Sequence, residues 1–221
     1  PVEPPPVDED DFTASGLTFS KDAYDLIVYY ETGGKSYYNK YLKKPSWPGY
    51  ASGVTIGVGF DLGYNTPETI WDAWGGKLSD REVKLLISVS GSKYTGNPRG
   101  KNAARRIRNA VSVSWEDAIK VFNQHTIPIF AEKTRRTFKN LENLHPNVQG
   151  AILSLVFNRG SSMRDIPSRR EMRNIRTHVA NGRVDLIPKE IRSMKRLWAG
   201  KGLDGLLKRR EAEAKLIEAV L

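Results

Sequence analysis

The chain of 221 residues contains no cysteine and only three histidines, and none of its apolar runs approaches the length of a membrane-spanning helix. The absence of cysteine excludes disulfide bonds, thiolate zinc sites and cysteine nucleophiles. His125, His145 and His178 are scattered and near no spaced carboxylate, so we expect each of them at the surface or at a helix end. We therefore expect no metal site, no cofactor and no insertion into a membrane.

Several signatures of common functions are also missing. Gly57-Val58-Gly59 resembles the start of a dinucleotide-binding fingerprint, but Leu62 stands where the third glycine belongs. The sequence contains no P-loop and no Gly-x-Ser-x-Gly elbow. No charged segment followed by an apolar one opens the chain, so no Sec-type signal peptide is visible. Because the first residue is not methionine, we expect the chain to be the C-terminal part of a longer protein.

Charge is distributed unevenly along the chain. Residues 1–11 contain five acids and no base, and leaving them out raises the net charge from +10 to +15 for the remaining 210 residues. This segment is also rich in proline and poor in apolar residues, so we expect a linker or tail over 1–17 and one folded domain over 18–221. A strongly cationic body attracts polyanions, which include nucleic acid, anionic lipids and the anionic polymers of a bacterial envelope.

Hydrophobic spacing and capping signals predict a predominantly helical protein. The first helix is expected to begin after Ser20 and to end at Gly33-Gly34, which leaves Glu31 in its last turn. Pro128 is expected to kink a long helix that follows Ser114. Further helix starts are indicated by Thr66-Pro67, by capping boxes at 79–82 and 168–171, and by a looser one at 114–117. Helices are also expected at 146–157, which has the most buried pattern, near 185–198 and at 204–220.

Residues 53–63 combine an apolar strand pattern with a row of glycines. At the strand period of two, one face carries Val54, Ile56, Val58, Phe60 and Leu62. The opposite face carries only Thr55 and Asp61 among glycines, so another backbone or a flat ligand could approach it closely. The commoner meaning of such glycines is a bulge or a hairpin in a half-buried strand.

The segment 32–54 contains several lysines and aromatic residues but no acid. A loop of this length is uncommon in a compact domain and is often functional. Amphipathic aromatic rings can stack on sugar rings, or they can pack the loop onto the body. For any single ring the packing role is the commoner one. The candidates are Tyr37, Tyr38, Trp47 and Tyr50.

Two carboxylates flank this segment. Hydrolysis of a glycosidic bond needs one carboxyl group to protonate the leaving oxygen and a second one to activate water, within a sugar's width of each other. Glu31 lies at a helix C-terminus beside an apolar face, which favours the protonated form that an acid catalyst requires. Asp61 is the next acid along the chain, and the hydroxyl of Thr55 could hold the attacking water. On spacing alone, a solvated helix end at Glu31 and a turn residue at Asp61 form the commoner alternative.

Three motifs resemble a known family. Glu31, then a loop and Gly-Val-Thr-Ile-Gly-Val-Gly-Phe-Asp-Leu-Gly at 53–63, resembles the catalytic segment of pesticin-type muramidase domains, which are similar to phage-type lysozymes. Ala-Ile-Leu-Ser-Leu-Val-Phe-Asn-Arg-Gly at 151–160 resembles the central helix of phage-type lysozymes, and Gly-Leu-Asp-Gly-Leu-Leu-Lys-Arg-Arg-Glu-Ala-Glu at 202–213 resembles their closing element. The motifs together span about residues 18–220, although 90–145 matches no motif of the family.

The resemblance implies an α+β, predominantly α-helical, lysozyme-like fold with a small β-hairpin lobe after the first helix and a larger helical lobe. It implies that Glu31, Thr55 and Asp61 are catalytic, and that the enzyme cleaves the β-1,4 bond between N-acetylmuramic acid and N-acetylglucosamine with inversion. Most phage-type lysozymes carry their second acid between the glutamate and the threonine. This chain has none there, so the assignment depends on Asp61. Asn158 and Arg159 are expected to brace the substrate cleft, with a helix-end role as the alternative.

The expected partner is peptidoglycan, in the periplasm or cell wall of a target bacterium that the protein reaches by secretion or another route. The chain is then the lytic domain of an antibacterial toxin or effector, with an immunity protein as a candidate partner, or a phage endolysin. We expect a monomer. One alternative is a non-catalytic cationic protein that binds nucleic acid or cell wall, and another is a hydrolase of a glycan such as chitosan. No recognition-helix motif accompanies Arg105-Arg106-Ile107-Arg108, so we expect no nucleic-acid partner.

Overall fold

The computed structural model describes residues 8–49, 51–95 and 98–221. Within this part of the chain the protein is predominantly helical, with two antiparallel sheets of two strands each, which agrees with the predicted α+β class. The described residues divide into two compact units where the sequence predicted one domain. The terminal unit comprises residues 8–30 and 128–221, and the middle unit comprises Glu31–Ile127. The boundaries fall within α1 (Lys21–Thr32) and α7 (Ile127–Thr137).

Helix α8 (Pro146–Arg159) is the centre of the terminal unit. His145 caps its start, because the imidazole Nδ1 accepts a hydrogen bond from the Asn147 N–H at 3.1 Å. Every residue from Val148 to Val156 is buried, which confirms the buried helix predicted at 146–157. The other elements of this unit, besides most of α1 and α7, are β1 (Phe12–Ala14), β2 (Leu17–Phe19), η4 (Leu141–Asn143), η5 (Pro167–Arg169), α9 (Arg170–Ala180), η6 (Val184–Leu186), α10 (Ile187–Ser193), η7 (Met194–Leu197) and α11 (Asp204–Glu218).

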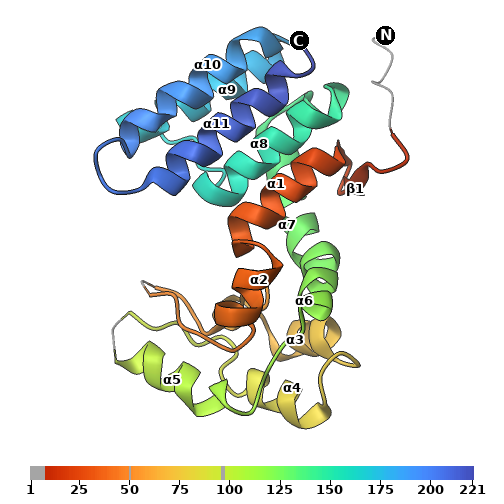
Figure 1. Ribbon diagram of the computed structural model, residues 1–221, viewed down its shortest axis with the longest axis vertical. Helices are drawn as coiled ribbons and strands as arrows, with labels where there is room; N and C mark the ends of the chain where they lie inside the picture. The colour runs from red at the N-terminus through yellow and green to blue at the C-terminus, as the bar shows by residue number, and fades with distance from the viewer. Residues whose placement is uncertain (1–7, 50, 96–97) are drawn as a thin grey trace. The chain divides into compact units, whose positions relative to one another are not determined.

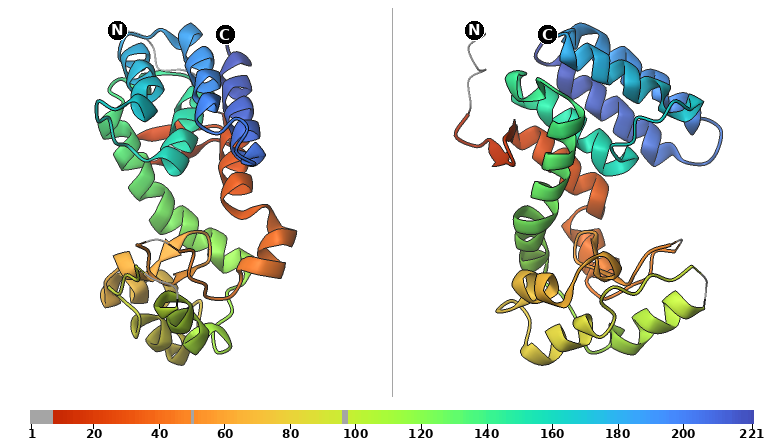
Figure 2. Two further views of the ribbon diagram at one scale, coloured as in Figure 1. Left: turned by 90° about the vertical axis from the view of Figure 1, so that its left-hand side faces the viewer. Right: turned by 180° about the vertical axis from the view of Figure 1, so that it is seen from behind.

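Two positions on α8 determine how closely other elements approach it. At Gly150 an added Cβ would lie 2.1 Å from the Cβ of Ala23, so a larger residue would push α1 away. Gln149 is buried, and its side-chain oxygen accepts from the Thr18 N–H at 2.8 Å while its amide donates to the Leu144 carbonyl at 2.7 Å. Helix α11 packs along α8, and α10 packs along both α9 and α11, as Figure 1 and Figure 2 show.

The N-terminal hairpin is part of the terminal unit. Strand β1 pairs antiparallel with β2, and the Phe12 ring stacks on the Tyr24 ring of α1 with centroids 4.0 Å apart. Leu17 and Phe19 are buried. The predicted tail over residues 1–17 therefore needs correction, because 12–17 belong to the fold; residues 1–7 of that tail lie outside the described residues. Strands β1 and β2 have three residues each, which is too short for a recognisable alternation of apolar and polar residues, so the sequence did not predict them.

A buried group of charged residues joins α11 to α8. Arg210 and Glu213 are completely buried and form an ion pair, with 2.6 Å between Arg210 Nε and a carboxylate oxygen of Glu213. Arg209 Nη2 donates to the Ser154 carbonyl at 3.0 Å, and Ser154 Oγ donates to Glu213 at 2.6 Å. Burial lowers the pKa of Arg210, and the nearby Glu213 carboxylate opposes this shift. Loss of one partner would leave a buried charge without compensation.

The middle unit contains short helices, and the sequence predicted several of their starts correctly. Thr66 accepts from the Thr69 N–H at the start of α3, and Ser79 forms a capping box with Glu82 at the start of α4. Ser114 caps α6. The elements of this unit are α2 (Lys35–Tyr37), η1 (Tyr38–Leu42), β3 (Thr55–Ile56), β4 (Phe60–Asp61), η2 (Leu62–Tyr64), α3 (Pro67–Trp74), α4 (Asp80–Ile87), α5 (Arg99–Arg108), α6 (Trp115–Val121) and η3 (Phe122–Thr126).

Residues 53–63 form a hairpin in which β3 pairs antiparallel with β4. The chain reverses around Gly57 and Gly59, whose φ angles of 57° and 68° are rarely adopted by other residues. At Gly57 an added Cβ would also approach the Trp74 ring to 2.9 Å. The glycines therefore mark a turn of a hairpin, which was the commoner of the two interpretations given for them from the sequence. The predicted apolar face is confirmed, since the buried residues include Val54, Ile56, Val58, Phe60 and Leu62.

Two helix predictions need correction. Residues 168–171 do not form a capping box: no side chain caps α9, and the Glu171 carboxylate instead pairs with Arg196 at 2.7 Å. The helix that follows Ser114 does not simply kink at Pro128, because the π-helical segment η3 separates α6 from α7 just before it. Among the residues that the structure describes, no helix is both long and apolar enough to cross a membrane.

Candidate active site

Glu31, like the other two predicted catalytic residues, belongs to the middle unit. It is half-buried in the last turn of α1, a turn that contains no basic residue. Gly33 and Gly34 have φ angles of 71° and 88° and follow the helix directly, as predicted. The Gly34 N–H donates to the Thr32 hydroxyl at 3.0 Å, so the backbone just beyond Glu31 is tied back to the helix end.

Thr55 occupies the middle of a short ladder of three segments. Its N–H donates to the Ser46 carbonyl at 2.7 Å, and its carbonyl accepts from the Ser46 N–H at 3.0 Å. On its other side Thr55 is directly opposite Asp61. Because both backbone groups of Thr55 are directed to Ser46, its pair with Asp61 is of the non-hydrogen-bonded kind, with Cα atoms about 4.5 Å apart. Opposed residues share one face of a sheet, so Ser46, Thr55 and Asp61 form a polar row on that face.

Backbone amides fix the carboxylate of Asp61. Its Oδ1 accepts from the Gly53 N–H at 3.0 Å and from the Gly63 N–H at 2.8 Å, and its Oδ2 accepts from the Gly53 N–H at 3.1 Å. Gly53 is required here, because an added Cβ would lie 2.3 Å from Oδ1 of Asp61. The side chain is half-buried, so it is an oriented acceptor that keeps part of its surface open to solvent.

The polar row combines a hydroxyl with a fixed carboxylate. These are groups that can hold a water molecule and take its proton during hydrolysis. Glu31 supplies a second carboxyl group from a separate element of the same unit. Within the described residues there is no group of three or more histidine, aspartate or glutamate side chains that could hold a metal ion.

The four aromatic candidates for sugar binding differ in exposure. Tyr37 is 51% exposed, and its ring centroid lies 4.7 Å from that of Tyr41, which is also exposed. Tyr38 is completely buried, its hydroxyl donates to a backbone carbonyl at 3.2 Å, and burial raises its pKa. The sugar-stacking role predicted for Tyr38 is therefore corrected to packing. Trp47 is half-buried, and Tyr50 lies outside the described residues.

Asn158 and Arg159 belong to the terminal unit, whereas the catalytic candidates belong to the middle unit. Asn158 Oδ1 accepts from Arg210 at 3.0 Å. Arg159 Nη2 donates to the Ser168 carbonyl at 2.5 Å, and its guanidinium lies 5.1 Å from the ring centroid of Trp198. These contacts favour the helix-end role that the sequence left open, and a role in substrate binding stays a prediction.

The sequence did not identify three residues of the candidate site. Ser46 extends the polar row, and the amides of Gly53 and Gly63 hold the Asp61 carboxylate. A signal for the two glycines was present, since they stand eight residues before and two residues after Asp61. Ser46 had no local signal, because it pairs with a residue nine positions away across an irregular loop. No protein-family model matches the chain, and no curated protein sequence matches it. The candidate site therefore rests on its geometry and on the three motifs described above.

Proposed function

We propose that the chain is a muramidase, a glycoside hydrolase that cleaves the β-1,4 bond between N-acetylmuramic acid and N-acetylglucosamine in peptidoglycan. The observation that carries this proposal is the pairing of Thr55 with Asp61, whose carboxylate is held by the amides of Gly53 and Gly63. A lysozyme-like fold is part of the same proposal. It is supported by a predominantly helical chain with a small hairpin after its first helix.

In the proposed reaction Glu31 is the general acid and protonates the glycosidic oxygen as the bond to the anomeric carbon breaks. A water molecule held by the Thr55 hydroxyl and the Asp61 carboxylate attacks the anomeric carbon from the opposite face. Its proton passes to Asp61, and the new reducing end has inverted configuration. Inversion requires the two carboxyl groups to be about 6.5–9.5 Å apart, which leaves room for the water.

The loss of turbidity of purified peptidoglycan tests this proposal directly. Glu31→Gln removes the proton donor, so we expect lysis to fall at least about 100-fold. Asp61→Asn and Thr55→Ala should also abolish lysis while circular dichroism shows an intact fold. Glu68→Gln is the matched control, because Glu68 is an exposed acid of the middle unit in the first turn of α3. Lysis at the wild-type rate by a folded Glu31→Gln variant would overturn the proposal.

Product analysis separates the proposal from the alternatives. A muramidase leaves N-acetylmuramic acid at the new reducing end, which mass spectrometry identifies, and proton NMR of the first products shows whether the anomer is inverted. A retained anomer would contradict the role given to Asp61. A protein without lytic activity that binds duplex DNA with steep salt dependence would instead be the cationic binding protein.

The proposed place of action is the cell wall or periplasm of a target bacterium. This setting fits both the lytic domain of a toxin or effector and a phage endolysin. For a toxin, the producing cell needs protection, so we expect an immunity protein that blocks lysis. Capture of such an inhibitor from the producing cell tests this, and its absence would favour the endolysin.

A further inference from the structure

Helix α5 (Arg99–Arg108) carries five basic residues and no acid. Lys101, Arg105 and Arg108 are spaced at i, i+4 and i+7, so they share one exposed stripe of the helix. Ala103 and Ile107 are buried on another side. Like charges at these spacings repel one another, and an anion bound along the stripe would relieve this repulsion.

The stripe forms one wall of a pocket within the middle unit. The cavity has a volume of about 260 Å³ and is lined by Ser46, Trp47, Lys101, Ala104, Arg105 and Arg108. None of these described lining residues is acidic. The volume is below the range of about 300–1,000 Å³ that is usual for whole ligands. The pocket therefore suits an anionic side group of a larger molecule.

The opposite wall is held in place by two features of the loop before β3. The indole N–H of Trp47 donates to the Ser52 carbonyl at 3.1 Å, and an added Cβ at Gly100 would lie 2.3 Å from the indole ring. The ring therefore lies directly on the α5 backbone. Arg108 Nη1 donates to the Pro45 carbonyl at 2.9 Å, which ties the basic stripe to the same loop. Trp47 presents a fixed, flat, apolar surface beside the cations.

Ser46 joins this pocket to the polar row. It lines the pocket, and it is also the ladder partner of Thr55, with its side chain on the same face as Thr55 and Asp61. Cβ atoms of directly opposed residues lie about 4.5–5.5 Å apart. The pocket therefore begins about one residue's width from the hydroxyl that is proposed to hold the attacking water.

We infer that this pocket binds a carboxylate carried as a side group on the glycan strand, next to the bond that is cut. Guanidinium and ammonium groups form strong, charge-assisted hydrogen bonds with carboxylates, and the Trp47 ring covers the aliphatic part of the side group. Peptidoglycan offers such carboxylates on the peptide attached to muramic acid or, where the peptide has been removed, on the free lactyl group. The inference rests on the proposed function and assigns Lys101 and Arg105 as substrate-binding residues.

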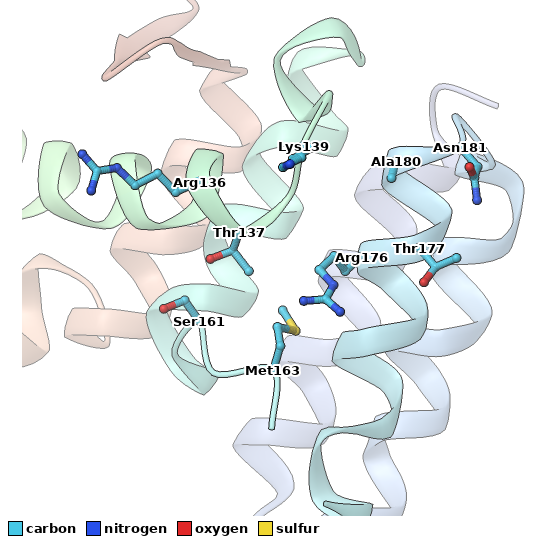
Figure 3. Close-up of a pocket in the computed structure, with 9 residues that line it drawn as sticks. All are labelled: Arg136, Thr137, Lys139, Ser161, Met163, Arg176, Thr177, Ala180 and Asn181. Atoms are coloured by element: carbon cyan, nitrogen blue, oxygen red, sulfur yellow. The ribbon is translucent and has the colours of Figure 1, made fainter. Parts of the chain in front are cut away.

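A second cationic pocket, in the terminal unit, provides a contrast (Figure 3). It is larger, at about 580 Å³, and its lining includes Arg136, Lys139 and Arg176 but no aromatic residue. Arg136 is ion-paired with Glu132 at 2.5 Å, and Figure 3 shows Arg176 reaching toward Met163. Nothing in this pocket belongs to the polar row. Arg176→Ala therefore removes the same charge from a pocket that has no expected role in glycan binding.

Binding of labelled hexasaccharides, measured by fluorescence anisotropy in the Glu31→Gln full chain, tests the inference. The probes are a neutral chitin hexasaccharide, an alternating hexasaccharide with free lactyl carboxylates, and the same glycan carrying tetrapeptides. Loss of one charge-assisted contact in Arg105→Ala should weaken binding of a carboxylated probe about tenfold and leave the neutral probe unchanged. The matched control is Arg106→Ala, the next exposed arginine of α5, which does not line the pocket.

Each outcome decides the inference. Selective loss in Arg105→Ala for the free-lactyl probe alone assigns the lactyl carboxylate, because that carboxyl group is an amide in the tetrapeptide probe. Loss for the tetrapeptide probe alone assigns a carboxylate of the peptide, and loss for both probes shows that the pocket accepts either one. Equal losses in Arg105→Ala, Arg106→Ala and Arg176→Ala, or an equal loss on the neutral probe, would overturn it. If the wild type lyses peptidoglycan but these variants do not differ, only this inference fails. If binding follows the expected pattern but the wild type lyses nothing, only the proposed muramidase activity fails.

Discussion

In the terminal unit Arg210 and Glu213 are completely buried and paired with each other, whereas in the middle unit Lys101 and Arg105 are exposed and the Asp61 carboxylate is half-buried. The two buried charges compensate each other, and Ser154 and Arg209 donate further hydrogen bonds to Glu213, so the pair contributes to the folded state. The exposed cations and the Asp61 carboxylate can still accept a partner from solution. The same residue types therefore serve stability in one unit and are available for binding in the other.

The largest expected effect is on the buried pair. Glu213→Ala leaves Arg210 buried without its carboxylate, which should cost about 3–5 kcal/mol in the free energy of unfolding measured with urea. Glu218→Ala on the same helix is the control, because its ion pair with Arg192 is exposed and is worth at most about 1 kcal/mol. Equal costs for the two variants would contradict the view that the terminal unit depends on its buried charges.

A pH titration of stability gives the next effect. Burial alone would raise the pKa of Glu171, but hydrogen bonds from Arg196 and Arg170 outweigh it and lower the pKa to about 2 from its ordinary value of 4.5. The folded state therefore binds this proton more weakly than the unfolded chain does. The stabilisation is fully present above about pH 5 and is lost as the pH falls toward 2, and it amounts to about 3 kcal/mol.

Glu171→Gln removes the titrating group, so the decline in unfolding free energy between pH 5 and pH 2 should become shallower by about that amount. Thermal unfolding monitored at several pH values measures it. Replacement of Asp185, an exposed carboxylate of the same unit, should leave the pH dependence almost unchanged. An identical slope in Glu171→Gln and the wild type would show that the pairing with Arg196 does not contribute.

A smaller effect is expected where the middle unit holds its carboxylate. Gly53→Ala places a methyl group 2.3 Å from both Asp61 Oδ1 and the Gly63 nitrogen. The carboxylate must therefore move away from the amides that hold it. We expect a cost of about 1–3 kcal/mol in stability and a loss of lysis similar to that of Asp61→Asn. Gly205→Ala is the control, since open space surrounds that position and alanine favours a helix. Full lysis by Gly53→Ala would mean that this position of the Asp61 carboxylate is not needed for activity.

The smallest effect on stability is expected for an exposed ring. Tyr37→Ala removes a half-exposed side chain and its contact with Tyr41, which should cost about 0.5 kcal/mol. If the ring stacks on sugar, KM for peptidoglycan fragments rises severalfold while kcat is unchanged. Tyr29→Ala is matched in exposure and also loses an aromatic neighbour, Tyr30. The same KM in both variants would leave Tyr37 with the packing role alone.

Local signals in the sequence predicted the elements that local interactions determine. Ser20, Thr66 and Ser79 each accept a hydrogen bond from a backbone N–H three residues later. Their capping roles can therefore be predicted from four consecutive residues of the sequence. The capping box predicted at Ser168 does not form, because the Glu171 carboxylate pairs with Arg196 instead. Arg196 is 25 residues away, so no local pattern reveals this partner.

The candidate site shows the same division. The apolar face of the hairpin follows from a period of two, and Asp61 and Thr55 were found from the motif at 53–63. The burial of Tyr38 beside Trp115 and the contact of Trp47 with Gly100 depend on residues that are far away in the sequence. The arginines of α5 have no distinguishing pattern in the sequence until this ring is placed beside them.

The N-terminal hairpin also has a mechanical consequence. Strand β1 is attached to the rest of the terminal unit through its pairing with β2 and the stack of Phe12 on Tyr24, and β2 is anchored by the bond from Thr18 to Gln149 of α8. Tension applied at the N-terminus would therefore peel β1 from β2 before it strained the central helix. We expect the pairing of β1 with β2 to separate first under tension, while the helical core stays folded.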